Sequence, residues 1–240
     1  MPPIHARVDH VAVAVPALRP ALARWEDELG GAPMWEFDNG TFVGVQVRYP
    51  AGKLELIAPP SDPERAQGSF VAGFLDRFGA QVHHLTLKVD DHDAALRSIT
   101  AAGLDVVDVA QQGPHWTEGF LRPSQVGGMI VQVAWTDRTD EDWAAANGGT
   151  LPVPRDDAPP LLGPTLLHPD LVEAAKVWST LGASVEPDDD GFEAVWPGSD
   201  LTVRVERAPA GVRPGPRALR FRGAAPAPAG GAHGPAVEPA

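Results

Sequence analysis

The chain has 240 residues, of which 43% are hydrophobic, a formal net charge of −13 and no cysteine. This length allows one large or two small domains with a hydrophobic core. The acidic balance excludes general nucleic-acid binding and docking on anionic membranes, and the lack of cysteine excludes disulfides and thiolate metal sites. Because the N-terminus has no long apolar region and no segment is long and apolar enough for a membrane span, we expect a cytoplasmic protein.

The first predicted elements, a strand and a helix over residues 8–25, recur at residues 82–99. A constant offset of 74 residues aligns His10 with His84. Both copies begin with alternating apolar residues, typical of a half-buried strand, and continue with apolar residues at helical spacing. The chain therefore contains an internal repeat, in which His84 rather than His83 is the repeated histidine.

The two faces of each opening strand differ in character. His10 shares its face with two alanines, and His84 shares its face with Thr86 and Lys88, whereas the opposite faces carry valine and leucine. A branched apolar face favours packing against a helix. We therefore expect the histidine faces to line a cavity and His83 to lie on the outer face.

Each copy closes with a strand that holds one polar residue between apolar neighbours. Glu55 has this place in residues 53–60, and Gln132 has it in residues 127–135. A buried carboxylate or amide is costly without a partner, so both side chains are expected to bond to another group. With the alternating stretch at residues 41–50, each copy reads as a strand, a helix and about three strands.

Three further regions follow the second copy. Residues 138–160 are polar and rich in proline and glycine, which is typical of a linker. Residues 161–225 show a third, degenerate strand–helix pattern, in which Gly163 holds the position of His10. Residues 226–240 have low complexity, and we expect them to form a flexible tail.

Four segments resemble the vicinal oxygen chelate superfamily, in its methylmalonyl-CoA epimerase-like and glyoxalase-like branch: VDHVAVAVPAL, KLELIAP, VHHLTLKVDD and FLRPSQVGGMIVQVAW. The resemblance implies an α+β fold in which residues 5–137 form paired βαβββ modules, with a curved mixed sheet around a divalent metal. The third unit would be a degenerate copy of such a module. Carried over residue by residue, the resemblance implies four metal ligands, which are His10, Glu55, His84 and Gln132.

The donor types agree with a divalent cation. Two imidazoles, one carboxylate and one amide oxygen form a mixed nitrogen and oxygen set that suits Zn, Ni, Co, Mn or Fe(II). The sequence leaves the identity of the metal open among these. A cation so placed can hold two neighbouring substrate oxygens and stabilise an enolate formed beside a carbonyl.

Departures from the family pattern bear on the chemistry. Family epimerases usually carry glutamine on the first closing strand and glutamate on the second, and here the two are exchanged. Extradiol dioxygenases have glutamate where Gln132 stands, so ring cleavage is disfavoured. The proton-abstracting glutamate of the epimerases corresponds most nearly to Gln46, which is not a base. The resemblance to glyoxalase I implies that Glu55 can transfer the proton if it leaves the metal, with His115 and Glu118 as weaker alternatives.

Two functions stay open from the sequence. One is a metal-dependent isomerase, epimerase or lyase that acts on a small carbonyl compound or an acyl-CoA. The other is a non-catalytic protein that binds a small molecule such as an antibiotic. Both are compatible with a homodimer and need neither nucleic acid nor a membrane. Six residues are expected to contact the small molecule: Gln46, Arg48, Thr86, Lys88, His115 and Trp116.

Overall fold

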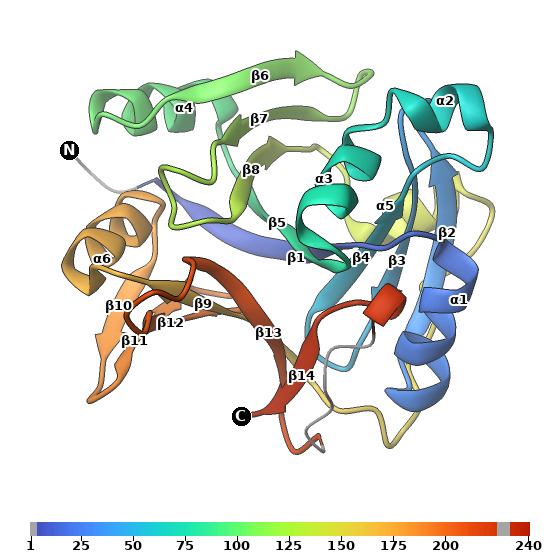
Figure 1. The fold of residues 1–240 in the computed structure, drawn as a ribbon. Coiled ribbons are helices and arrows are strands. Elements are labelled where there is room, and N and C mark those ends of the chain that lie inside the picture. The colour runs from blue at the N-terminus through green and yellow to red at the C-terminus, as the bar shows by residue number, and fades with distance from the viewer. Residues whose placement is uncertain (1–3, 225–230) are drawn as a thin grey trace. The chain divides into compact units, whose positions relative to one another are not determined.

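The computed structural model describes residues 4–224 and 231–240. Two consecutive segments have the order strand, helix, strand, strand, strand, which confirms the α+β class and the paired modules (Figure 1). The first module consists of β1 (Ala6–Ala14), α1 (Leu18–Ala23) with the π-helical turn η1 (Arg24–Glu28), β2 (Ala32–Asp38), β3 (Val43–Arg48) and β4 (Lys53–Ala58). The second consists of β5 (Gln81–Val89), α4 (His92–Ala101), β6 (Val106–Gln111), β7 (Thr117–Leu121) and β8 (Ile130–Trp135). Two short helices, α2 (Pro63–Gln67) and α3 (Phe70–Phe78), join them.

The strands of both modules form an eight-stranded sheet with the order β2-β3-β4-β1-β5-β8-β7-β6. In each module the opening strand pairs in parallel with the closing strand, β1 with β4 and β5 with β8. The remaining pairs within each module are antiparallel. The fold thus brings the first and the last strand of a module side by side, and this pairing positions the candidate site.

The third module is present and begins a second sheet. It consists of β9 (Leu161–His168), α6 (Leu171–Thr180), β10 (Ser184–Pro187), β11 (Gly191–Val195) and β12 (Val203–Arg207). Two strands follow, β13 (Gly215–Phe221) and β14 (Ala236–Pro239), and the sheet order is β10-β11-β12-β9-β13-β14. In this order β13 and β14 take the places that β5 and β8 take in the first sheet, and they also pair in parallel. The second sheet therefore repeats the first sheet up to the place of β8.

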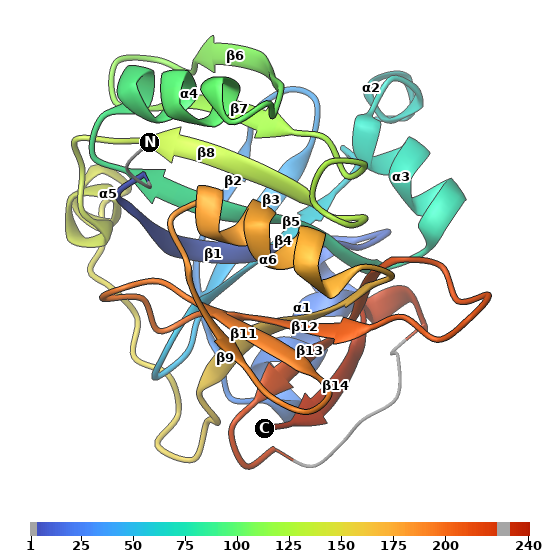
Figure 2. The same ribbon diagram turned by 90° about the vertical axis from the view of Figure 1, so that its left-hand side faces the viewer.

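The chain packs as two compact units. One contains the chain up to His10, His84–Arg138 and Gly163–Arg217, and the other contains Val11–His83, Thr139–Leu162 and the chain from Ala218. In the first unit α4 contacts β6 and β8, and α6 lies across β10, β11 and β12 (Figure 2). In the second unit α1 and α3 pack against β4. Among the described helices, none has the length and apolar character needed to cross a membrane.

Tryptophan side chains anchor the helices to the sheets. Trp25 is fully buried, and its backbone oxygen accepts a hydrogen bond of 2.9 Å from the hydroxyl of Tyr49. Trp178 in α6 is also fully buried and meets Trp196 edge to face, with ring centroids 5.7 Å apart. Trp196 donates its indole N–H to the oxygen of Leu181, so this core polar group is satisfied.

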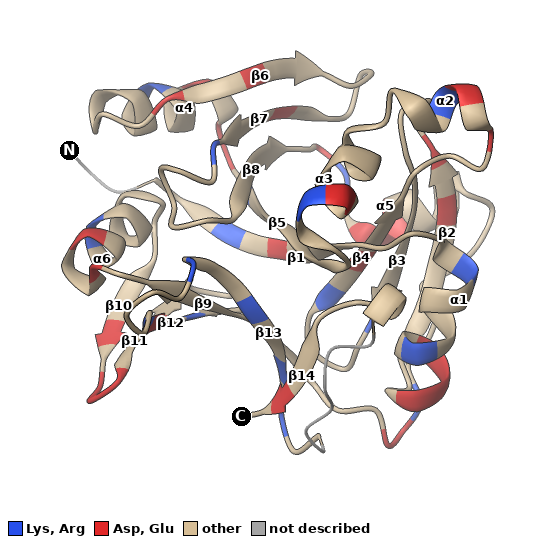
Figure 3. Ribbon diagram, in the orientation of Figure 1, with Lys and Arg blue, Asp and Glu red and all other residues tan. Residues whose placement is uncertain are grey.

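The stretch expected as a linker contains a helix, α5 (Asp140–Ala146). Thr139 and Asp142 form a capping box at its start, and Asp140 binds Lys53 at 2.7 Å. The surrounding proline and glycine residues predicted a linker without a helix. The helix forms nonetheless, because the capping box satisfies its first backbone N–H groups locally. The acidic turn between β10 and β11, at residues 188–190, is exposed. It is drawn in red in Figure 3.

The tail expected to be flexible contains ordered elements within its described part. Residues 226–230 lie outside the described residues, and the chain from Gly231 forms a 3-10 turn and β14. Trp25 donates its indole N–H to the oxygen of His233 at 3.0 Å, and Arg24 donates to the oxygen of Gly234. Composition misled here because backbone pairing with β13 and buried side-chain donors hold a segment that has few apolar groups of its own.

Gly163 explains why the third module carries no histidine at the place of His10. Its φ is +113°, and a Cβ atom at this residue would lie 2.1 Å from the backbone oxygen of Thr202. Two residues further on, Thr165 pairs with Arg204 on β12, so an arginine stands where the first module has Glu55. Arg204 is bonded to Asp188. The second sheet therefore lacks both ligand types at these two places.

We expect Gly163→Ala to lower the free energy of unfolding by at least about 2 kcal/mol, because the new Cβ adds a backbone clash to an unfavourable φ. Gly198→Ala is the matched control, since Gly198 has a φ of +73° but no atom within 4 Å of its Cβ position. Urea unfolding of both variants measures the difference. Equal losses in the two variants would show that the close approach of Thr202 does not constrain this position.

Candidate metal centre

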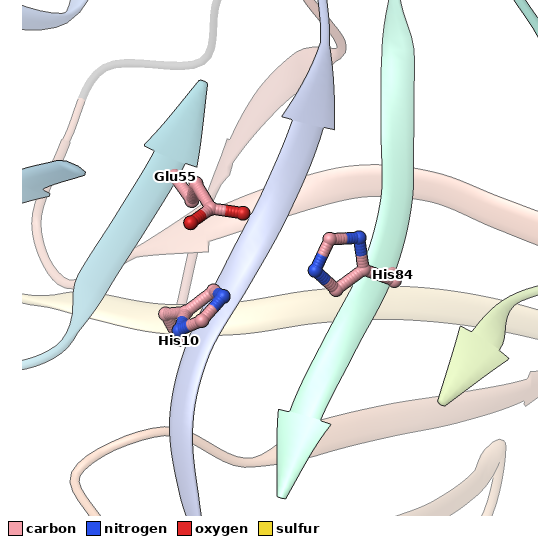
Figure 4. Close-up of side chains that lie close together, drawn as sticks. All are labelled: His10, Glu55 and His84. Carbon is pink, nitrogen blue, oxygen red and sulfur yellow. The ribbon is translucent and has the colours of Figure 1, made fainter. Parts of the chain in front are cut away.

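The described residues contain a buried cluster of three side chains that have metal-ligand atoms. These are His10 on β1, Glu55 on β4 and His84 on β5, and one ligand atom from each lies within 4.8 Å of the other two. Figure 4 shows the Glu55 carboxylate and the two imidazole rings converging from these three strands. Each residue is at most 7% exposed. Three of the four predicted ligands are therefore neighbours in the structure.

Cross-strand register explains how the repeat builds this cluster. Ala12 lies two positions after His10, on the same face of β1, and pairs directly with Glu55 on β4. In the second module Thr86 lies two positions after His84 and pairs directly with Gln132 on β8. Each opening-strand histidine therefore stands in the same relation to a polar residue on the closing strand.

Gln132, the fourth predicted ligand, is buried and bonded at both ends of its amide. Its Oε1 accepts a hydrogen bond of 2.6 Å from the hydroxyl of Thr86, and its Nε2 donates one of 2.7 Å to Glu118 Oε2. An amide oxygen has two lone pairs, so the bond from Thr86 leaves one of them for a cation. This orientation fits an oxygen ligand.

The hydrogen bonds of His10 fit a cation on Nε2. Nδ1 lies 2.7 Å from Asp9 Oδ2, and Nε2 lies 2.9 Å from Thr86 Oγ1. When Nδ1–H donates to Asp9, Nε2 presents a lone pair. The one hydroxyl hydrogen of Thr86 then has two acceptors, Nε2 and Gln132 Oε1. A cation on Nε2 leaves that hydrogen to Gln132, and each of these polar atoms has a partner.

His83 lies on the opposite face of β5 and is buried there rather than exposed. Its ring packs against Phe74 and Phe70 of α3, with centroid distances of 4.6 and 5.5 Å. Burial lowers the pKa of His83 to about 4, against a smaller opposite effect of the Glu55 carboxylate. The neighbouring histidines therefore have separate roles, since His83 is a neutral core residue and His84 faces the cluster.

The other predicted contact residues have different neighbours. Gln46 pairs with Glu55 across the strands, and its Nε2 donates to Glu55 Oε1 at 3.4 Å. Arg48 donates to the oxygen of Pro152, and His115 binds Asp137 at 2.9 Å. These contacts bring Gln46 to the cluster. For Arg48 and His115 they show partners elsewhere.

Lys88 and Trp116 are linked to two predicted ligands through an intervening carboxylate each. Lys88 Nζ binds Asp9 Oδ1 at 2.6 Å and lies 5.9 Å from the centre of the Trp116 ring. Trp116 donates its indole N–H to Glu118 Oε2 at 2.7 Å. Sequence reasoning missed Asp9. The available signal was a break in the repeat, because an acidic residue precedes His10 whereas a histidine precedes His84.

Paired βαβββ modules here present two histidines and a carboxylate from neighbouring strands, which is a set of donor atoms that could hold a divalent cation. Residues 9–120 match the family described as Glyoxalase/Bleomycin resistance protein/Dioxygenase superfamily. The chain belongs to this superfamily, since two enzymes at 33–35% identity also match it over most of their own length. The resemblance drawn from the sequence motifs is therefore confirmed.

Curated relatives match the paired modules. The ethylmalonyl-CoA/methylmalonyl-CoA epimerase of Cereibacter sphaeroides is 35% identical over 134 residues, which cover 53% of this chain and 96% of the relative. The mitochondrial methylmalonyl-CoA epimerase of Bos taurus is 33% identical over 133 residues, which cover 53% of this chain and 73% of the relative. Both matches leave nearly half of this chain uncovered.

Solved structures extend the fold similarity to most of the chain. A mutant of 4-hydroxymandelate synthase from Streptomyces coelicolor has a TM-score of 0.64, with 18% identity, over 92% of this chain and 71% of that one. A hypothetical protein from Staphylococcus aureus has a TM-score of 0.66, with 11% identity, over 98% of this chain and 100% of that one. At these identities the similarity shows the fold alone.

We expect the free energy of unfolding to fall as the pH is lowered from about 6.5 towards 4, because the unfolded chain protonates His83 before the folded chain does. The loss reaches about 3 kcal/mol and levels off below pH 4. In His83→Phe this part of the pH dependence disappears. Urea unfolding of the two proteins at pH 7, 5.5 and 4 measures it, and parallel curves would contradict the burial of a neutral ring.

We expect purified protein, after exposure to Zn or Co, to carry about one cation per chain and His84→Ala to lose most of it, because the variant lacks one of the clustered imidazoles. His83→Phe is the control, since it removes the adjacent histidine on the other face. Elemental mass spectrometry of the three proteins measures the content. A cation retained in His84→Ala but lost in His83→Phe would show that the cation binds on the His83 face of β5 and would contradict the proposed site.

Proposed function

We propose that this protein is a divalent-metal-dependent epimerase or isomerase that acts on a small carbonyl compound, with acyl-CoA thioesters as the leading substrate class. The observation that carries the proposal is the buried His10–Glu55–His84 cluster, built from the opening strands of both modules and one closing strand. The two epimerase relatives support the acyl-CoA class, since their names state such substrates.

The cluster supplies the groups that this chemistry needs. A divalent cation held by His10, Glu55 and His84, with Gln132 as a fourth donor, would polarise a substrate carbonyl. The strands fix these side chains through backbone pairing, so the donors need little rearrangement on binding. Zn, Ni, Co, Mn and Fe(II) all suit two imidazoles with oxygen donors.

Proton transfer is assigned to Glu55. Its Oε1 accepts a hydrogen bond from Gln46, so a neutral amide orients the carboxylate without adding charge. Gln46 itself has no proton-accepting group of the required basicity, and Glu55 is the carboxylate within the cluster. To take this role Glu55 would have to leave the cation, and a carboxylate so released beside a polarised carbonyl is suited to accept the proton from the neighbouring carbon.

The binding-protein alternative has one observation in its favour. Gln46 occupies the place nearest to the proton-abstracting glutamate that the resemblance implies, and its amide is bonded to Glu55. A site without a second carboxylate at that place suits a protein that holds a small oxygen-bearing molecule without changing it. Metal loading with tight ligand binding but no isotope exchange would support this alternative.

We expect metal-loaded protein in D2O to exchange the α-hydrogen of methylmalonyl-CoA for deuterium, because an epimerase removes and returns that proton. Glu55→Gln should lower the exchange rate by about 10²–10⁴-fold. Proton NMR and mass spectrometry of the recovered thioester measure the exchange, with His83→Phe as the control.

If metal-loaded protein exchanges no α-hydrogen in methylmalonyl-CoA, ethylmalonyl-CoA or a panel of small 2-oxo and 2-hydroxy carbonyl compounds, the enzyme proposal is wrong. If exchange occurs but Glu55→Gln matches the unmodified chain, the assignment of Glu55 is wrong and the metal-dependent reaction stands. Glu118→Gln is then the next variant, since Glu118 is one hydrogen bond from Gln132.

A further inference from the structure

Two of the predicted metal ligands, His10 and Gln132, belong to a closed ring of seven side chains in one compact unit. Five of its contacts have donor–acceptor distances of 2.6–2.9 Å, and an indole hydrogen bond and a cation–π contact complete it. In order, the ring runs through Lys88, Asp9, His10, Thr86, Gln132, Glu118 and Trp116 and returns to Lys88.

We propose that Asp9 and Glu118 are positioning residues, each of which fixes the donor atom that one ligand presents to the cation. Asp9 sets the tautomer of His10, and Glu118 sets the orientation of the Gln132 amide. The proposal rests on the metal site of the proposed function. It assigns neither residue a contact with the substrate.

Asp9 accepts the Nδ1–H of His10 and thereby leaves the Nε2 lone pair for the cation. The Asp9 side chain is 9% exposed, and Asp9 Oδ2 lies 2.7 Å from His10 Nδ1. A carboxylate behind a ligating imidazole fixes its tautomer and ring orientation and increases its basicity towards the metal. Thr86 does not select this tautomer by itself, because its hydroxyl can either donate to Nε2 or donate to Gln132 Oε1 while accepting from a protonated Nε2, so the choice falls to Asp9.

Lys88 holds the Asp9 carboxylate in place. Its side chain is 7% exposed, and its ammonium group binds Asp9 Oδ1, the oxygen that does not face His10. A buried carboxylate is stable only when its charge is paired, so Lys88 offsets the cost of placing Asp9 there. The face of the Trp116 ring, 5.9 Å from Nζ, adds a second favourable contact for the ammonium.

Glu118 decides which end of the Gln132 amide points towards the other ligands. A glutamine side chain can turn by 180° and present either oxygen or nitrogen, and only the oxygen binds a cation. Glu118 Oε2 lies 2.7 Å from Gln132 Nε2, and a carboxylate accepts hydrogen bonds but donates none. The nitrogen is therefore held on the Glu118 side, and Oε1 is held on the side of Thr86 and His10.

The ring also accounts for the exchange of glutamate and glutamine between the two closing strands. The second closing strand has the neutral Gln132, and the negative charge lies one hydrogen bond further away, on Glu118. Trp116 and Gln112 donate to the same carboxylate, at 2.7 and 3.2 Å, which holds it in one orientation. The chain thus keeps a carboxylate near this strand without making it a direct ligand.

The test compares Asp9→Asn and Glu118→Ala with the unmodified full-length protein. Competition with a chromogenic chelator measures Zn affinity, and the visible absorption of Co-loaded protein reports the ligand geometry. Nitrogen-15 NMR of the histidine rings in metal-free protein reports the tautomer of His10, whose signals are those absent from His10→Ala. Asp188→Asn is the control, because Asp188 pairs with Arg204 in the second sheet and contacts none of the four predicted ligands.

We expect each variant to weaken Zn binding by about 10–100-fold and to change the Co spectrum, because both act through a ligand. The unmodified protein should show the Nδ1–H tautomer of His10, and Asp9→Asn should shift it towards Nε2–H. Glu118→Gln should recover most of the affinity that Glu118→Ala loses, since its amide oxygen still accepts from Gln132. Asp188→Asn should retain full affinity.

Unchanged Zn affinity and Co spectra in Asp9→Asn and Glu118→Ala, or an Nε2–H tautomer in the unmodified protein, would overturn the proposal. Both outcomes are independent of catalysis. Weakened affinity in a protein that exchanges no α-hydrogen would refute the proposed function and leave the positioning roles standing. If the unmodified protein binds no cation, the proposed function fails. If, in addition, Asp9→Asn leaves the tautomer of His10 unchanged, the positioning role of Asp9 is refuted as well.

Discussion

The parallel pairing of the first and last strands in each βαβββ module is the constraint on which the candidate site depends. It sets Glu55 opposite Ala12, two positions past His10, and sets Gln132 opposite Thr86. A slip of one residue in either pair would turn the closing-strand side chain to the other face of the sheet. Backbone hydrogen bonds thereby fix the donors before any cation binds.

Burial then forces these polar side chains into mutual contact. Asp9, His10, Thr86 and Gln132 lie in a largely apolar sheet, where an unpaired polar group costs about 1–3 kcal/mol. Each of them is within hydrogen-bond distance of another side chain. Because a partly satisfied network is costly, the geometry of one member constrains the next. Substitutions at residues that are not ligands therefore change the orientation of the ligands. The second sheet repeats the strand order, but Gly163 and Arg204 replace the donors there.

The sequence predicted what periodicity and repetition encode. Alternation and the offset between His10 and His84 predicted the modules, the shared face and three residues that the structure brings together. It did not predict Asp9 as a partner of His10, since strict alternation assigns adjacent residues to opposite faces and takes no account of side-chain reach. Lys88 was expected at the substrate and is bonded to Asp9, a pairing that depends on tertiary packing. The segment after Gly231 was misread because its order comes from strand pairing rather than composition.

X-ray absorption spectroscopy of Zn-loaded protein tests the central claim most directly, because it reports the atoms bound to the cation. The cluster predicts two imidazole nitrogens at about 2.0–2.1 Å with oxygen donors completing the shell. The nitrogen contribution should fall to one imidazole in His10→Ala. A shell made of oxygen alone, or one that keeps two imidazoles in both His10→Ala and His84→Ala, would contradict the site.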